Sequence, residues 1–225
     1  MKRLLIVDDE ATIVKGLVYS LEADGYITDA AYDGLEALEK IQAADYDLIL
    51  LDVMLPGMSG IEICQRVRDF SNVPILMLTA KGEDMDKILG LEYGADDYMT
   101  KPFNILEVKA RIRTILRRTT PDQNVKALRV RGLQLLPERR SASLDGRDVN
   151  LTATEYDLLE LLMNNRGKVF SREELLAEVW SDNYDGDERT IDVHIRRLRE
   201  KIEPNPKNPE FIQTKWRVGY YFSEK

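Results

Sequence analysis

The alternation of apolar strands and amphipathic helices in the first half of this chain constrains its fold more than any other feature. Uninterrupted apolar runs predict strands at Leu4–Val7, Leu48–Leu51 and Val73–Leu78, and apolar residues recur at helical spacing between them. Strands without polar alternation are typical of a parallel sheet covered on both faces. A short strand at Asp97–Met99 and a weak strand signal near Ile27–Ala31 complete the set. We therefore predict an α/β domain with a doubly wound five-stranded parallel sheet.

This pattern stops at the polar stretch RRTTPDQNV. Because the stretch contains Pro121 and has no apolar period, we predict a linker at residues 120–125 between domains at 1–119 and 126–225. The second half has short β-prone segments, a hairpin signal at Asp145-Gly146 and three helical segments, which predict an α+β domain. A chain of 225 residues is long enough for each domain to bury its own core.

The charge balance differs between the two halves. The net charge of −8 comes mostly from residues 1–119, which hold 14 Lys and Arg against 21 Asp and Glu, whereas residues 120–225 hold 18 against 19. A nucleic-acid surface in the second half is therefore compatible with the acidic total. Cys64 is the only cysteine, which excludes an internal disulfide framework and a cysteine zinc site. No stretch reaches the ~20 apolar residues of a membrane span, and the N-terminal apolar run is too short for a signal peptide. We expect a cytoplasmic protein without a membrane partner.

Charged and hydroxyl side chains follow the predicted parallel strands at the points where they end. Asp8 and Asp9 come after the first strand, Asp52 after Leu48–Leu51, and Thr79 and Lys101 after later strands. The carboxyl ends of such strands meet at one edge of the sheet, where ligands bind. Clustered carboxylates favour Mg²⁺, and an aspartate can act as a nucleophile toward a phosphoryl group. Because no Gly-rich phosphate loop is present, we predict a phosphoacceptor site rather than a nucleotide site.

CheY-like response-regulator receivers have signature blocks that this chain resembles throughout residues 1–119: VDDE, LLDVMLPGMSG, MLTA and GADDYMTKPF. The resemblance implies that Asp52 accepts phosphate from a sensor histidine kinase. It implies a Mg²⁺ site, whose ligands are Asp8, Asp9, Asp52 and the Met54 carbonyl. It also implies a set that coordinates phosphate and switches the domain, namely Thr79, Tyr98 and Lys101. The peptide bond between Lys101 and Pro102 is usually cis in this family.

The same resemblance implies that phosphorylation produces a homodimer. The expected interface consists of three ion pairs between subunits, which are Lys87 with Glu107, Asp97 with Arg111, and Asp96 with Arg118. A two-fold axis would repeat each pair. Ordinary surface charge would give the same residues in the sequence, so these pairs are a prediction.

A basic helix is predicted at Arg189–Ile202. Ile191, Ile195 and Leu198 recur at helical spacing and predict its inward face, while arginines occupy much of the remainder. A basic outer face suits the phosphates and base edges of the DNA major groove. A solvated charged face gives the same pattern, so the neighbouring segments decide between the two.

Those segments resemble the OmpR/PhoB-type winged helix over residues 126–225, in the blocks LTATEYDLLELLMNNRGKVFSREELLAEVW, RTIDVHIRRLREKIE and GYYF. The resemblance implies a winged helix-turn-helix domain with Arg189–Ile202 as recognition helix, a loop at Ser181–Asp187 that touches RNA polymerase, and a wing near Lys215–Val218. We expect promoter DNA as the partner. The candidate DNA contacts are Arg189, Thr190, His194, Arg196, Arg197, Arg199, Trp216 and Arg217.

The wing departs from the family pattern. Relatives commonly read Thr-Val-Arg-Gly where this chain has Thr214-Lys215-Trp216-Arg217. A one-residue shift in a hairpin moves a side chain to the other face, so Arg217 does not simply replace the usual arginine. One hypothesis places Arg217 in a narrow A/T-rich minor groove, with Trp216 along the sugar-phosphate backbone. The alternative has Trp216 covering the domain core and Arg217 in solvent.

Two other functions compete with a phosphorylation-controlled regulator. An aspartate-nucleophile phosphohydrolase usually has its nucleophile and helper acid two residues apart after the first strand, whereas Asp8 and Asp9 are adjacent here. A DNA-binding protein with a purely structural first domain would not need the complete set of acids, hydroxyl and lysine. We therefore predict a transcription regulator that is not an enzyme. The sequence does not specify the kinase, the promoters or the direction of regulation.

Overall fold

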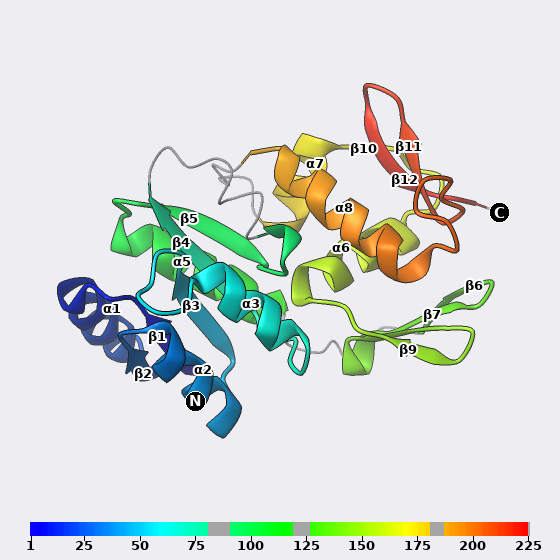
Figure 1. The fold of residues 1–225 in the computed structure, drawn as a ribbon. Coiled ribbons are helices and arrows are strands. Elements are labelled where there is room, and N and C mark those ends of the chain that lie inside the picture. Colours follow the sequence, from blue (N-terminus) through cyan, green and yellow to red (C-terminus); the bar gives the residue numbers. More distant parts are fainter. Residues whose placement is uncertain (81–90, 119–126, 181–186, 225) are drawn as a thin grey trace. The chain divides into compact units, whose positions relative to one another are not determined.

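The computed structural model describes residues 1–80, 91–118, 127–180 and 187–224 (Figure 1). The chain forms two compact units, Met1–Leu116 and Arg117–Lys225, which we describe separately. The predicted linker at residues 120–125 lies outside the described residues. Within those residues, no helix combines the length and apolar character needed to cross a bilayer.

The first unit is built on a five-stranded sheet in the order β2-β1-β3-β4-β5. Its strands are β1 (Arg3–Val7), β2 (Ile27–Ala31), β3 (Leu48–Asp52), β4 (Ile75–Ala80) and β5 (Asp97–Lys101). All neighbouring strands pair in parallel. Every residue of β3 is buried, as expected for a strand with helices on both faces. The predicted fold class is confirmed.

Helices cover both faces of this sheet. The described helices are α1 (Ala11–Ala23), α2 (Gly34–Ala43), α3 (Gly60–Arg68) and α5 (Ile105–Arg118). One core cluster joins α1 and α5 to alternate residues of the strands. The other strand face is buried as well, together with the inward residues of α2 and α3. This layering leaves the strand ends, rather than the sheet faces, to form a site.

The second unit begins with an antiparallel sheet in the order β6-β7-β8-β9. These strands are β6 (Leu128–Val130), β7 (Leu133–Leu136), β8 (Ser141–Leu144) and β9 (Arg147–Val149). Asp145 and Gly146 connect the last two with φ angles of 51° and 78°. Positive φ at both turn residues matches the hairpin predicted from the Asp-Gly pair.

Three helices and a second sheet complete the unit. The helices are α6 (Ala153–Asn164), α7 (Arg172–Val179) and α8 (Arg189–Ile202), and the strands are β10 (Phe170–Ser171), β11 (Ile212–Lys215) and β12 (Gly219–Phe222). The sheet order is β10-β12-β11, so β11 and β12 form a terminal hairpin (Figure 1). A single core joins all three helices to both sheets. This is the winged-helix arrangement that the sequence predicts.

Candidate functional site

The strand order of the first unit assembles the predicted acidic cluster, which consists of Asp8, Asp9 and Asp52. β1 and β3 are neighbours with Val7 opposite Leu51, so the residues that follow them lie side by side. One carboxylate oxygen from each member lies within 4.8 Å of the others. Asp8 is 0% exposed and Asp52 is 3% exposed, whereas Asp9 faces solvent. A buried nucleophile candidate thus lies beside an accessible acid.

Lys101 brings a cation into contact with this cluster. Its Nζ lies 2.8 Å from Asp52 Oδ2 and 2.7 Å from Asp8 Oδ2. Glu10, which the candidate set omitted, approaches the same ammonium at 3.6 Å. β5 is separated from β3 by β4, so the long lysine side chain spans the edge of one strand. The Lys101–Pro102 bond is cis, as the resemblance implied.

The electrostatics of the cluster favour an added cation. Burial raises the pKa of Asp52, and the hydrogen bond from Lys101 offsets this only in part. Burial lowers the pKa of Lys101, but hydrogen bonds to Asp52 and Asp8 outweigh it and the pKa is raised. The ammonium therefore stays charged while three carboxylates converge on it. Oxygen ligands with excess negative charge are the environment that Mg²⁺ prefers.

The remaining predicted receiver residues are Thr79, Met54 and Tyr98. Thr79 is buried at the end of β4, and its hydroxyl donates to the Ala80 carbonyl at 3.4 Å. Met54 donates its backbone N–H to Asp52 Oδ1 at 3.3 Å. Tyr98 is half-buried on β5, opposite Met77 of β4. Thr79 and Met54 thus lie beside Asp52, whereas Tyr98 lies within β5, three residues before Lys101. Their roles toward a phosphoryl group stay predictions.

Gly60 is a positioning residue that the candidate set omitted. A Cβ at this position would lie 2.0 Å from the Asp52 carbonyl oxygen, so any larger residue displaces the chain that carries Asp52. The Gly60 N–H also donates to the Val53 carbonyl at 2.9 Å. The block LLDVMLPGMSG contained this signal, because its last glycine begins α3 directly after the loop.

The predicted dimer residues have partners within the single chain. Arg111 Nη1 donates to both Asp97 oxygens, at 2.9 and 3.2 Å, and Arg111 Nη2 lies 3.0 Å from Glu107 Oε1. Asp96 is fully buried, and its Oδ2 accepts from Arg68 and from the Ile75 N–H, each at 3.1 Å.

Asp96 therefore serves the fold of its own subunit, which argues against the expected pair with Arg118. Lys87 lies outside the described residues, as does the side chain of Arg118.

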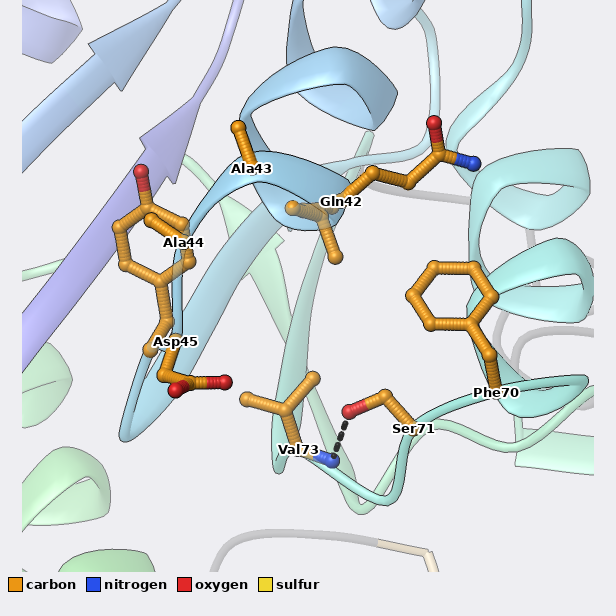
Figure 2. A pocket seen from close by; sticks show the side chains of 9 residues that line it. Gln42, Ala43, Ala44, Asp45, Phe70, Ser71 and Val73 are labelled. Carbon is orange, nitrogen blue, oxygen red and sulfur yellow. Dashed lines mark hydrogen bonds between the residues drawn. The ribbon is translucent and has the colours of Figure 1, made fainter.

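A cavity of about 470 Å³ lies at the other end of the first sheet (Figure 2). Its wall comes from the end of α2, the segment before β3 and the segment between α3 and β4, and includes Gln42, Ala43, Ala44, Asp45, Phe70, Ser71 and Val73. These residues precede β3 and β4, whereas Asp52 and Thr79 end those strands. The cavity is therefore separate from the acidic cluster.

In the second unit, α8 exposes fewer basic residues than its sequence contains. Its apolar stripe is buried as predicted, with Ile191, Ile195 and Leu198 in the core. The side chains of Arg189 and Arg196 are 69% and 59% exposed. These two arginines, seven residues apart, lie on one helix face. Arg196 Nε also donates to Glu200 Oε1 at 3.0 Å, but this pair is exposed, unlike the pair of Arg197 described below.

Two predicted DNA contacts on α8 are wrong, because Thr190 and His194 are buried. His194 is 1% exposed, and its ring centroid lies 5.5 Å from that of Trp180 at the end of α7. Thr190 lies one helical turn before it and is 2% exposed. α8 packs against both α6 and α7, so its buried face is wider than the apolar stripe alone indicates.

Arg197 also forms an ion pair inside the domain. Its Nε donates to Glu155 Oε1 at 2.8 Å, while Lys201 Nζ lies 2.5 Å from Glu155 Oε2. Glu155 is fully buried and accepts from the Thr152 N–H as part of the capping box that begins α6. The sequence signal was the Thr-x-x-Glu spacing before an apolar run. The expected DNA contact by Arg197 is therefore replaced by a buried ion triad.

Arg199 holds the wing rather than projecting from α8. Its Nε and Nη2 donate to the Ile212 carbonyl at 3.0 and 2.8 Å, and Nη2 also donates to Thr214 Oγ1 at 2.8 Å. Asp192 forms a second link, because its Oδ1 accepts from Tyr220 Oη and Arg172 Nε, each at 2.7 Å. Both sets of bonds fix α8 relative to β11 and β12.

The wing is a tight hairpin with an exposed tip. Lys215 pairs with Gly219, and the Val218 N–H donates to the Lys215 carbonyl at 2.9 Å. Arg217 has a φ of 59° at the tip. Trp216 is 80% exposed, so the alternative in which it covers the domain core is wrong.

Comparison with known families divides the chain in the same way. Residues 4–113 match the model described as response regulator receiver domain, and residues 146–222 match the model described as transcriptional regulatory protein, C terminal. The acidic cluster thus lies in the first match, and α8 with the wing in the second.

Similar solved structures span both domains. A single-residue mutant of RitR is 31% identical with a TM-score of 0.79, and the match covers 100% of both chains. The response regulator DrrB, a Thermotoga maritima OmpR/PhoB homolog, is 32% identical with a TM-score of 0.53, and 99% of each chain is covered. A putative response regulator from Chloroflexus aurantiacus is 43% identical with a TM-score of 0.50, over 52% of this chain and 98% of its own. The chain therefore belongs to the OmpR/PhoB-type response regulators, with a receiver domain and a winged-helix DNA-binding domain.

Proposed function

We propose that this chain is a transcription regulator switched on by phosphorylation of Asp52 by a sensor histidine kinase. The observation that carries the proposal is the environment of Asp52. Its buried carboxylate lies 2.8 Å from Lys101 Nζ and within 4.8 Å of carboxylate oxygens from Asp8 and Asp9. A structural aspartate needs no such set of neighbours, whereas phosphoryl transfer needs positioning and charge neutralisation.

The reaction follows from these neighbours. An Asp52 oxygen attacks the phosphorus of phosphohistidine, an O–P bond forms, and the P–N bond breaks with its electron pair returning to the imidazole. Lys101 is positioned to pair with the added phosphoryl oxygens. Asp8, Asp9, Asp52 and the Met54 carbonyl would hold Mg²⁺, which neutralises phosphoryl charge when bound.

The switch couples this chemistry to the dimer surface. Phosphorylation adds about −1.5 to −2 charges and new acceptor oxygens. We propose that Thr79 turns its hydroxyl toward them and that Tyr98 moves into the space that Thr79 vacates. The strand that carries Tyr98 also carries Asp97, which binds Arg111. A shift of this strand would expose Asp97 and Arg111 to a second subunit. Glu107 is already exposed, and its proposed partner across the interface is Lys87.

The dimer would then bind two repeated half-sites in promoter DNA, about one helical turn apart. Arg189 and Arg196 are the candidates on α8 for the major groove, and Arg217 is the candidate for the minor groove. The expected RNA polymerase contact at Ser181–Asp187 falls almost entirely outside the described residues. It stays a prediction.

Incubation of the full chain with Mg²⁺ and acetyl phosphate tests the phosphoacceptor. Intact-mass spectrometry should show one phosphoryl group on the wild type and none on Asp52→Asn, because an amide is not a competent nucleophile. Asp9→Ala should slow the reaction by removing a metal ligand. Asp45→Asn is the matched control, since Asp45 is an exposed acid at the other end of the sheet.

Full phosphorylation of Asp52→Asn would overturn the assignment. Sustained release of phosphate, many times the amount of protein, would favour a phosphohydrolase instead.

A further inference from the structure

The wing tip exposes apolar surface that the fold does not use. Trp216 is 80% exposed and Val218 is 49% exposed, whereas Trp180, the other tryptophan, is 2% exposed in the core. Isolated exposed apolar residues are common on protein surfaces. Here, however, two occur within three residues at the end of a hairpin, which makes them candidates for contact with a partner.

The hairpin holds these side chains in a fixed place. The Lys215 carbonyl closes the turn by accepting from the Val218 N–H at 2.9 Å. At its base, Gly219 lies so close to β10 that a Cβ would stand 1.9 Å from the Phe170 carbonyl oxygen. Arg199 secures the other strand at Ile212 and Thr214. These contacts hold the backbone that carries Trp216 in place. Little backbone conformational freedom is therefore lost when the tip binds a partner.

The charge at the tip identifies the partner as a polyanion. Lys215 and Arg217 flank Trp216, and the segment from Thr214 to Val218 contains no acid. The tip also continues from the face of α8, because Arg199 of that helix binds Thr214 two residues before Trp216. Figure 1 shows α8 beside the hairpin of β11 and β12. Double-stranded DNA has the charge that matches this tip, and DNA bound along α8 would pass next to the wing.

We propose that Trp216 is an apolar wedge that enters the minor groove beside the site read by α8 and partly unstacks one base step. Apolar side chains act in this way in proteins that kink DNA, and pyrimidine–purine steps open most easily. The flat indole can stack on the exposed base. This inference rests on the proposed DNA-binding function. It adds a preference for DNA in which the sequence beside the main site contains an easily unstacked base step.

Duplexes selected from random DNA by the full-length wild-type protein provide the test, with 2-aminopurine substituted at successive flanking positions. Wild type should change 2-aminopurine fluorescence at one flanking step, because unstacking from the neighbouring base raises it and stacking of the indole quenches it. Trp216→Ala should abolish the change and weaken binding about tenfold. Trp216→Arg, which restores the residue common in the family, should bind without the change and so separates a wedge from a charge contact. Tyr19→Ala is the matched control, because Tyr19 is also 80% exposed but belongs to the receiver.

The outcomes distinguish this inference from the function on which it rests. If wild type binds the selected duplex and no flanking 2-aminopurine responds, the wedge is wrong and DNA binding stands. If wild type selects no DNA at all, the proposed function fails and the inference fails with it. A shift of Trp216 emission with anionic phosphatidylglycerol vesicles, but not with the duplex, would assign the tip to a membrane and overturn the wedge.

Discussion

The receiver and the DNA-binding domain differ in how their predicted residues are used. In the receiver, Asp8, Asp9, Asp52 and Lys101 come together at one edge of the sheet as the sequence predicts. On α8, most of the basic or polar residues expected to touch DNA are instead buried or bonded within the domain. The environment of a strand end was therefore predictable from the sequence, whereas that of an individual helix position was not.

The difference has a geometric cause. A residue that ends a parallel strand lies at a known edge of the sheet, whatever packs on the faces. A helix residue has no such fixed environment, because the width of the buried face depends on how many partners the helix has. Arginine is also ambiguous, since its guanidinium can bind phosphate or satisfy a buried carboxylate equally well. The predictions below test this contrast, beginning with the largest effect.

The buried triad of Glu155, Arg197 and Lys201 should be the largest single contribution of α8 residues to stability. Glu155→Gln should lower the free energy of unfolding of the DNA-binding domain by about 3 kcal/mol, because it breaks a buried ion pair from one side. Glu174→Gln is the matched control, since Glu174 completes an equivalent capping box on α7 at the surface. That change should cost about 1 kcal/mol or less. Both tryptophans belong to this domain, so urea denaturation followed by their fluorescence measures the effect.

The triad also predicts how the stability of this domain depends on pH. Burial raises the pKa of Glu155, but Lys201 and Arg197 outweigh it and hold the pKa below its ordinary value of 4.5. The stability from this group is therefore present above about pH 4.5 and is lost as the pH falls through the lowered value. The difference between wild type and Glu155→Gln should shrink in that acidic range. A difference that stays constant from pH 7 to pH 3 would contradict the triad.

The arginines of α8 should divide into two classes. Arg196→Ala should weaken DNA binding by about 1–3 kcal/mol if the side chain reads a base, or lower the salt slope of binding by about one if it contacts a phosphate. Arg197→Ala should instead destabilise the domain and leave the salt slope unchanged. Binding to selected duplexes at several salt concentrations, with melting curves for each variant, measures both. If Arg197→Ala lowers the salt slope and leaves stability intact, Arg197 leaves Glu155 to bind DNA and the contrast with the receiver disappears.

Particular residues show what a sequence can and cannot predict here. The parallel sheet, the three helices of the second domain and the Asp-Gly hairpin followed from periodicity and turn chemistry. The role of Asp96 did not, because adjacent acids look alike in a sequence although Asp96 binds Arg68 and Asp97 binds Arg111. His194 looked like a polar residue on a basic helix, and only its contact with Trp180 reveals the packing of α7. Such pairs are distant in sequence, so local patterns carry no information on them.

A substitution on the receiver surface should have a smaller effect. Within one chain Arg111 and Asp97 are 11% and 1% exposed. In the proposed dimer their pairs lie between subunits at a solvated surface, where each contributes about 0–1 kcal/mol and a two-fold axis repeats it, so Arg111→Glu should weaken dimers of the phosphorylated protein by about 1–2 kcal/mol. Sedimentation with and without beryllofluoride, a phosphate mimic, measures this. Arg117→Glu is the control, because Arg117 is an exposed cation on the same helix outside the predicted pairs. Identical dimerisation with and without the mimic would overturn the phosphorylation-dependent homodimer.

The smallest effect belongs to Arg217, where this chain departs from its relatives. Arg217→Ala should remove a preference for A/T-rich flanks, worth less than about 1 kcal/mol, and leave reading of the core site unchanged, because a narrow minor groove attracts arginine. Duplexes that differ only in flanking composition measure the preference. Arg147→Ala is the control, since Arg147 is an exposed arginine on a different hairpin of the same domain.

A second substitution separates the side chain of Arg217 from its backbone. Arg217 has a φ of 59°, which glycine adopts without strain and alanine does not. Arg217→Gly therefore removes the guanidinium while relaxing the turn, and it should lose the A/T preference to the same extent as Arg217→Ala. If the glycine variant keeps the preference and the alanine variant loses it, the shape of the turn, and not the charge at its tip, makes the discrimination. Arg217 would then join Arg199 as a residue that shapes the DNA-binding surface without reading DNA.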